Sequence, residues 1–183
     1  ARAPKLFEDL VPDKLPLATI TKVLQNILDE SVSVRDMRTI IEVLSTESAR
    51  TQDADDLTAA VRPRLGRMIV QGLVEINDNL PVITLEPSLE QMLHNVLQQS
   101  SNNQSLVIEP KLAEGLLKAL AENTRQVENQ GLPAVLVVSP GIRPWLSKII
   151  RHRLSDLTVL SYSEIPEDQS VKVVATVSIE ETN

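Results

Sequence analysis

The residue types that most often carry catalysis are scarce in this chain of 183 residues, which contains two histidines and no cysteine. A nucleophilic triad needs Ser or Cys beside a histidine that a carboxylate orients. His94 and His152 each fall in a segment with helical periodicity, among polar neighbours, and their spacing fits no metal motif. We therefore expect both to be surface histidines, and we expect no catalytic residue, no metal ion and no cofactor.

Three carboxylates precede one predicted helix. Asp53, Asp55 and Asp56 resemble the beginning of a calcium loop. An EF-hand needs Gly at its sixth position and Glu at its twelfth, and this sequence has Thr58 and Arg64 there. Acidic side chains are stabilised at the amino-terminal end of a helix by its dipole. The pattern therefore predicts a helix start.

The loop Ser139–Arg143 lies between a predicted buried strand and a predicted helix. Proteins of the α/β class often bind phosphate at such a place, where backbone N–H groups at a helix N-terminus are free. The loop has a single glycine and matches neither the dinucleotide pattern nor the P-loop. A small-ligand-binding α/β domain that uses this loop is one alternative function.

Arginines near the start of a second helix form another candidate surface. Arg35 and Arg38 lie off its apolar face, and Asp36 and Glu42 alternate with them. The reading helix of a winged-helix nucleic-acid-binding regulator carries such arginines, which gives a second alternative function. The carboxylates and the net charge of −7 oppose binding to phosphates. Besides a solvated surface, a contact of Arg35, Asp36 and Arg38 with a neighbouring subunit or partner is the sharper interpretation.

A further group of arginines, Arg62, Arg64 and Arg67, follows on the third predicted helix. We interpret it in the same two ways, with a solvated helix surface as the simpler one.

The elements that position these residues begin with a helical hairpin over residues 17–44. Ile20, Val23, Leu24, Ile27 and Leu28 recur at helical spacing, so we assign them to one buried face. Ser33 is the predicted N-cap of the second helix. A third helix over residues 57–73 and a β-hairpin of residues 73–76 and 82–85 would complete a winged-helix-like domain. We assign this domain to residues 1–86.

The second half of the chain changes character. Helices are predicted near residues 89–97, 110–131 and 142–154, and a mobile polar loop at 100–105. Residues 134–138 and 157–161 read as buried strands, for which a right-handed parallel crossover is the default. Residues 171–179 alternate like an antiparallel or edge strand. The predicted fold class is α+β, in which residues 87–183 form a small α/β domain with a short mixed sheet.

Bulk composition narrows the function classes. Hydrophobic residues make up 42% and charged residues 23%, which is typical of a globular protein. Aromatic residues are only 2%, so few rings are present for base stacking, and the core must be aliphatic. No apolar run is long enough to span a membrane. The chain lacks an initiator Met and a signal-peptide pattern, so we expect a piece of a longer protein.

The order of motifs along the chain resembles the FlhA family of bacterial flagellar export gates and their relatives in virulence type III secretion. Residues Val23–Leu28 are similar to the family's VLQNLL helix, and Val34–Glu42 to its following V-x-IRD-x-R-T-I-L-E helix. The similarity continues through Leu57, Thr58, Val61, Arg62, Val138, Ser139, Arg143, Pro144 and Val159–Ser161.

This resemblance implies the last part of a cytoplasmic domain at the inner membrane, a component of the type III protein export apparatus that docks its partners without catalysis. It implies a homo-oligomeric, nonameric ring in the full-length protein, formed through residues 1–86. The implied partners are flagellar export chaperones, export substrates and the export ATPase complex, with no nucleic acid. Membrane contact would come only through an absent N-terminal half. The family's chaperone cleft lies mainly in earlier domains, so no cleft residue is assigned here.

Overall fold

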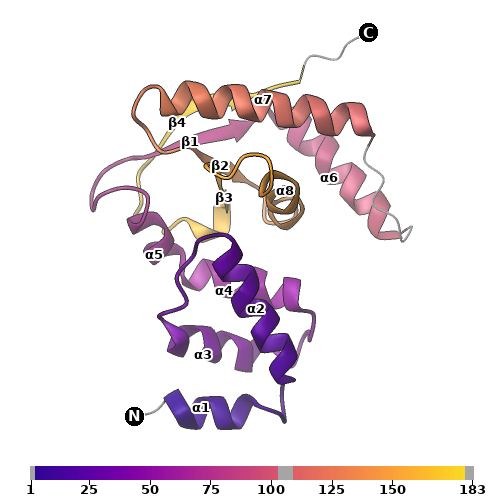
Figure 1. The fold of residues 1–183 in the computed structure, drawn as a ribbon, viewed down its shortest axis with the longest axis vertical. Helices are drawn as coiled ribbons and strands as arrows, with labels where there is room; N and C mark the ends of the chain where they lie inside the picture. Colours follow the sequence, from indigo (N-terminus) through magenta and orange to yellow (C-terminus); the bar gives the residue numbers. More distant parts are fainter. Residues whose placement is uncertain (1–2, 103–108, 180–183) are drawn as a thin grey trace. The chain divides into compact units, whose positions relative to one another are not determined.

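The computed structural model describes residues 3–102 and 109–179, which divide into two compact units (Figure 1). The first unit contains Ala1–Gly72 and, from much later in the chain, Ser163–Pro166. The second contains Leu73–Tyr162 and Glu167–Asn183. The chain thus leaves the first unit before the strand near residue 82, whereas the sequence suggested a boundary at residues 86 and 87.

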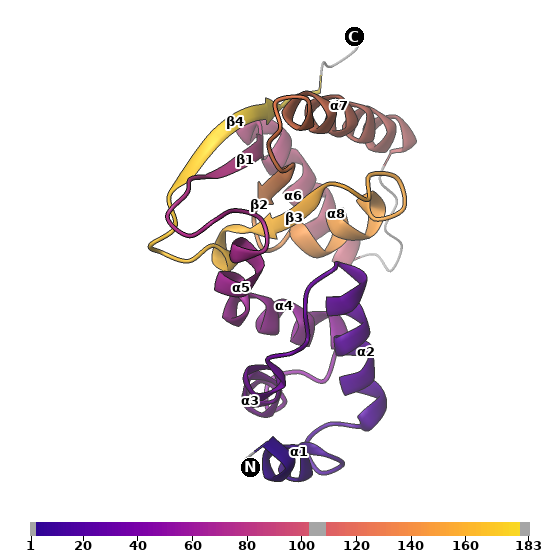
Figure 2. The ribbon, with the colours of Figure 1, turned by 60° about the vertical axis from the view of Figure 1, so that its left-hand side comes forward.

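The first unit is helical, and Figure 2 shows its longer helices α2, α3 and α4. Both α2 and α3 pack against α4, and α1 packs against α3. Their contact is aliphatic, as the helical spacing predicted: Ile20, Val23, Ile27, Ile40, Ile41, Leu44, Leu57 and Val61 are buried. The helices are α1 (Ala3–Leu10), α2 (Leu17–Asp29), α3 (Met37–Glu47), α4 (Ala54–Arg64) and α5 (Gly66–Gln71).

Two helix boundaries differ from the sequence prediction. Asp36, not Ser33, is the N-cap of α3: its carboxylate accepts from the Thr39 N–H at 3.2 Å and from the Thr39 hydroxyl at 2.7 Å. The predicted third helix is also divided, since α4 ends at Arg64 and α5 begins at Gly66. Pro63 lies just before the break, and proline weakens a helix because it lacks an N–H donor.

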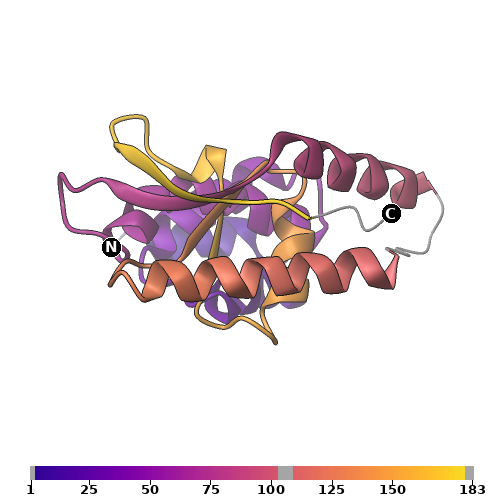
Figure 3. The same cartoon turned by 90° about the horizontal axis from the view of Figure 1, so that it is seen from above.

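The second unit is built on a four-stranded sheet in the order β3-β2-β1-β4, and every pairing in it is parallel. The helix α7 runs along β4 (Figure 3). The elements are β1 (Leu80–Leu85), α6 (Pro87–Asn102), α7 (Pro110–Glu128), β2 (Val135–Val138), α8 (Arg143–Ile150), β3 (Thr158–Ser161), the 3-10 turn η1 (Tyr162–Glu164) and β4 (Val171–Val177).

The predicted winged-helix hairpin is wrong. Residues 73–76 form turns and bends, and Ile76 is exposed. The strand near residue 82 instead pairs in parallel with β2 and β4, through Ile83 opposite Leu136 and Val82 opposite Val173. The predicted parallel crossover between β2 and β3 is confirmed. The strand β4 is an edge strand, as expected, but it is parallel, so the described sheet is not mixed.

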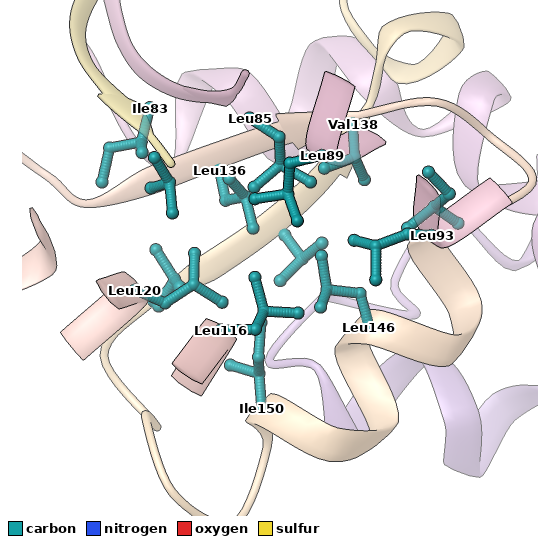
Figure 4. Close-up of a cluster of buried hydrophobic side chains, with 14 of the residues drawn as sticks. Ile83, Leu85, Leu89, Leu93, Leu116, Leu120, Leu136, Val138, Leu146 and Ile150 are labelled. Carbon is teal, nitrogen blue, oxygen red and sulfur yellow. The ribbon is translucent and has the colours of Figure 1, made fainter. Parts of the chain in front are cut away.

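The core of the second unit is aliphatic on one face of its sheet (Figure 4). Parallel sheets bury long apolar runs, and β2 is buried along its whole length. The side chains that fill this core come from both strands and helices: Ile83, Leu85, Leu89, Leu93, Leu116, Leu120, Leu136, Val138, Leu146 and Ile150. The helix α6 includes residues 100–102, where the sequence predicted a loop, and residues 103–105 of that prediction lie outside the described part of the chain.

Candidate functional site

The predicted subunit contact lies at the exposed beginning of α3. Arg35, Asp36 and Arg38 are all exposed. Asp36 is engaged in capping α3, and the Arg38 Nε donates to Glu42 Oε1 at 2.9 Å. An exposed i,i+4 pair of this kind contributes only about 0.3–0.5 kcal/mol. The three residues thus lie close in sequence at the beginning of α3, and both Arg35 and Arg38 are exposed.

A second exposed surface in the first unit was missed by the sequence analysis. Leu17 is 57% exposed and Leu28 53% exposed, although Leu28 was assigned to the buried face. With the half-buried Leu24 they recur at i, i+7 and i+11 along α2. We call these three residues the leucine stripe. The spacing itself was the available signal, because Leu17, Leu24 and Leu28 share a helical face distinct from that of Ile20, Val23 and Ile27.

The structure corrects the interpretation of Arg62, which the sequence analysis grouped with Arg64 and Arg67 as helix surface. It is only 1% exposed, whereas Arg64 and Arg67 are exposed as predicted. Its guanidinium pairs with Glu164 through Nε and with Glu30 through Nη1. Both carboxylates are distant in sequence, so Arg62 fastens the returning segment Ser163–Pro166 within the first unit. It is a structural arginine and not a surface contact.

The second unit carries an open groove with a volume of about 770 Å³. It lies where the strands end: Thr84 and Leu85 close β1, Ser139 follows β2 and Tyr162 follows β3. The remaining lining comes from α6 and β4, through Pro87, Glu90, Gln91, His94, Val173 and Thr176.

The carboxylate of Glu90 is held in this groove by hydrogen bonds from two other segments of the chain. Its Oε1 accepts the backbone N–H of Ser139 at 2.8 Å, and the Tyr162 hydroxyl donates to Oε2 at 2.9 Å. Partial burial raises the pKa of Tyr162 to about 12, and the hydrogen bond to Glu90 and the negative charge of that carboxylate act in the same direction. Tyr162 therefore remains a neutral donor at physiological pH. No local sequence pattern signals this trio, because its members lie on three separate segments.

The Ser139–Arg143 loop does not assemble a phosphate site. Arg143 is buried, and its Nη1 donates to the Val159 carbonyl at 3.4 Å. The Ser139 hydroxyl is buried and has no hydrogen-bond partner within the described residues. The loop contributes Ser139 to the groove, whereas the guanidinium of Arg143 is buried within the second unit.

The acidic cluster and the two histidines singled out in the sequence do not form a common site. Asp53 caps α4, accepting from the Asp55 N–H at 2.9 Å and the Asp56 N–H at 3.0 Å, which confirms the predicted helix start. His94 is half-buried in the groove, with its ring nitrogen 2.9 Å from the Gln98 amide. His152 is exposed, in a turn after α8. Within residues 3–102 and 109–179, no three His, Cys, Asp or Glu side chains gather as metal ligands would.

Comparison with known proteins gives consistent results. The model of the FHIPEP family matches residues 1–170. The flagellar biosynthesis protein FlhA of Escherichia coli K12 is 42% identical over 174 residues, which are 95% of this chain and 24% of that protein. FlhA of Bacillus subtilis is 31% identical over 176 residues, 96% of this chain and 26% of that protein. The chain thus spans about a quarter of the length of these relatives.

Solved structures agree with the fold. The nonameric EPEC SctV-C, solved by cryo-EM, has a TM-score of 0.81 and 28% identity, over 95% of this chain and 52% of that one. The Chlamydia pneumoniae CdsV protein, in its complex with CdsO, has a TM-score of 0.82 and 25% identity, over 96% of this chain and 50% of that one. Among the helices that the structure describes, none combines the length and apolar character needed to cross a bilayer.

Proposed function

Because this chain belongs to the FHIPEP family, we propose that it is part of the flagellar type III export gate, a platform that docks export substrates, chaperones and ATPase-complex components without catalysis. The family match over residues 1–170 is the observation that supports this most strongly. The relatives named as flagellar biosynthesis protein FlhA favour the flagellar system over a virulence system. Neither alternative function, nucleic-acid regulator or small-ligand domain, is favoured by any observation.

The full-length protein would assemble as a homo-oligomeric ring. Two solved structures of similar fold are described as nonameric. We assign the ring contact to the helical part within residues 1–86, through Arg35, Asp36 and Arg38 together with the leucine stripe of α2. Exposed leucines on a folded helix favour burial against another protein surface, and a second copy of the same unit is the partner that the nonameric relatives suggest.

The rest of the proposed setting follows from the family. The Chlamydia pneumoniae relative CdsV is described in a complex with CdsO, which supports export-apparatus partners for this chain too. The present residues would lie at the cytoplasmic face of the bacterial inner membrane, as part of a membrane-anchored full protein.

A chimera tests this function. The corresponding segment of E. coli FlhA is replaced by this chain, and swimming in soft agar is measured in a strain that lacks FlhA. We expect restored motility, because the two segments are 42% identical. A matched chimera with Leu93→Asp, which puts a carboxylate into the core of the second unit, should be non-motile. A normally expressed first chimera without any motility would contradict the proposal.

A further inference from the structure

The groove of the second unit lies at the change of direction in its sheet. From β1 the chain continues to β2 on one side, while β4 returns to the other side of β1. Open parallel sheets bind their ligands outside the carboxyl ends of the strands at such a switch point. Here the Thr84 and Thr176 hydroxyls, 3.3 Å apart, line the groove on the two strands that flank the switch.

The groove presents one fixed negative charge. Glu90 is held by the Ser139 N–H and the Tyr162 hydroxyl, so three segments of the chain set the position of its carboxylate. Neutral donors orient a carboxylate without cancelling its charge. Among the described residues that line the groove there is no Lys or Arg, and His94 is the only basic side chain. The carboxylate therefore lacks a permanent cation beside it.

The surroundings of Glu90 are apolar and accessible. Val173 of the edge strand β4 is 56% exposed, and the Tyr162 ring is 52% exposed. Leu85 and Pro87 add further apolar lining. A ring next to a carboxylate suits a cationic side chain, which gains from both groups. The apolar lining residues of the groove suit the apolar side chains that flank such a cation in a polypeptide. The net charge of −7 of this chain also favours a basic partner.

We propose that this groove is a docking site for a partner polypeptide, which places a Lys or Arg side chain on Glu90 and flanking apolar side chains on Val173 and Pro87. The site rests on the proposed docking function and names the chemistry of one partner contact within the second unit. Peptide binding tests this contact separately from motility, which tests the function itself.

NMR with a defined peptide tests the site. The probe is Ac-Ala-Leu-Arg-Leu-Ala-NH2, and its matched control has Gln in place of Arg. We expect the Arg peptide to shift the Ser139 amide resonance saturably in the 183-residue chain, since that N–H is bonded to Glu90. The Gln peptide should bind about tenfold more weakly, the loss expected for one charge-assisted hydrogen bond.

Variants connect the binding to the groove. Glu90→Gln removes the charge while keeping an acceptor oxygen, and it should weaken the Arg peptide about tenfold. Glu128→Gln removes an equal charge at the exposed end of α7 and should leave binding unchanged. Val173→Ser alters an exposed residue and so tests the same groove even where Glu90→Gln fails to fold; it too should weaken binding.

Three outcomes would overturn the proposal. The first is an unshifted Ser139 amide at millimolar Arg peptide. The second is equal binding of the Arg and Gln peptides. The third is equal binding of N-acetyl-arginine amide and the Arg peptide, because the ligand would then be a small cation and not a polypeptide segment.

Discussion

At the scale of single residues, Arg62 and Glu90 show how distant partners decide what a charged side chain does. Arg62 lies two residues before the end of α4, in a sequence that reads as exposed helix. Its burial follows from Glu30 and Glu164, which no local pattern connects to it. Glu90 likewise gains its role from Ser139 and Tyr162. The chain supplied the residue types, but only folding brought the partners together.

We predict that Arg62→Ala destabilises the protein by about 3–5 kcal/mol, because removal of one partner leaves a buried carboxylate, Glu164, without its cation. Urea unfolding followed by circular dichroism measures the loss. Arg64→Ala, at an exposed position two residues on, should change the stability by no more than about 0.5 kcal/mol. Equal effects of the two substitutions would mean that Arg62 is not buried as described.

Tyr162 is the only tyrosine of the chain, so its ionisation can be followed directly by ultraviolet absorbance. We predict a midpoint near pH 12, against the ordinary value of 10. Since the folded protein then binds this proton more tightly than the unfolded chain, the contribution to stability is complete below pH 10 and is lost as the pH rises toward 12. Glu90→Gln should lower the midpoint only in part, because burial remains. A midpoint of 10 in the folded wild-type chain would contradict the Glu90–Tyr162 contact.

At the scale of elements, the sequence predicted the helices well and the sheet poorly. Helical faces such as Ile20, Val23 and Ile27 are local, so their spacing alone identified them. The partner of Ile83 is Leu136 and that of Val82 is Val173. Such parallel pairings join segments far apart in sequence. The apolar segments 73–76 and 82–85, which are close in sequence, therefore suggested a hairpin that the structure does not have. The prediction that Leu28 is buried was wrong for a local reason. The helix α2 has two apolar faces, and only one of them is buried.

Two glycines at different places in the helices give a matched prediction. A Cβ at Gly66, where α5 begins, would collide with the backbone carbonyl of Glu164. At Gly115, inside α7, it would only touch the Ile179 side chain at 3.4 Å. We expect Gly66→Ala to lower the stability by about 1–3 kcal/mol, because the backbone must shift, and Gly115→Ala to raise it by about 0.5–1 kcal/mol, because alanine favours a helix. Thermal unfolding of both variants measures this; a neutral Gly66→Ala would contradict the close approach.

At the scale of the whole molecule, the resemblance in motif order already indicated the family, while the contact surfaces needed coordinates. The exposed Arg35, Asp36 and Arg38 were available from the helical pattern. The spacing of the leucine stripe was visible in the sequence, but its exposure became known only with the packing of α2. The groove around Glu90 was not predicted, because its lining comes from α6, the strand ends and η1.

Ring assembly should therefore depend on exposed residues that do not affect folding. In the full cytoplasmic region of the protein, we predict that Arg38→Glu or the double change Leu17→Ser and Leu28→Ser reduces ring formation at least about tenfold, a loss of about 1.4 kcal/mol per contact. Sedimentation velocity measures the assembled fraction. Arg64→Glu, which reverses an exposed charge on α4, is the matched control and should assemble normally.

Unchanged assembly of the Arg38→Glu protein would remove Arg38 from the contact, and unchanged assembly of the leucine variant would remove the stripe. Both results together would show that residues 1–86 do not form the ring in the proposed way.

The excursion of Ser163–Pro166 has a practical consequence for dissecting the protein. Because these four residues complete the helical unit, a recombinant fragment that stops at Gly72 would lack Glu164 and leave the guanidinium of Arg62 without that counter-ion. A fragment that starts at Leu73 would in turn carry a short insert whose natural binding place has been removed. We therefore expect that neither unit folds in its native form when the chain is simply cut at residue 72. A fragment of residues 1–72 that carries residues 163–166 on a designed linker should restore the helical unit.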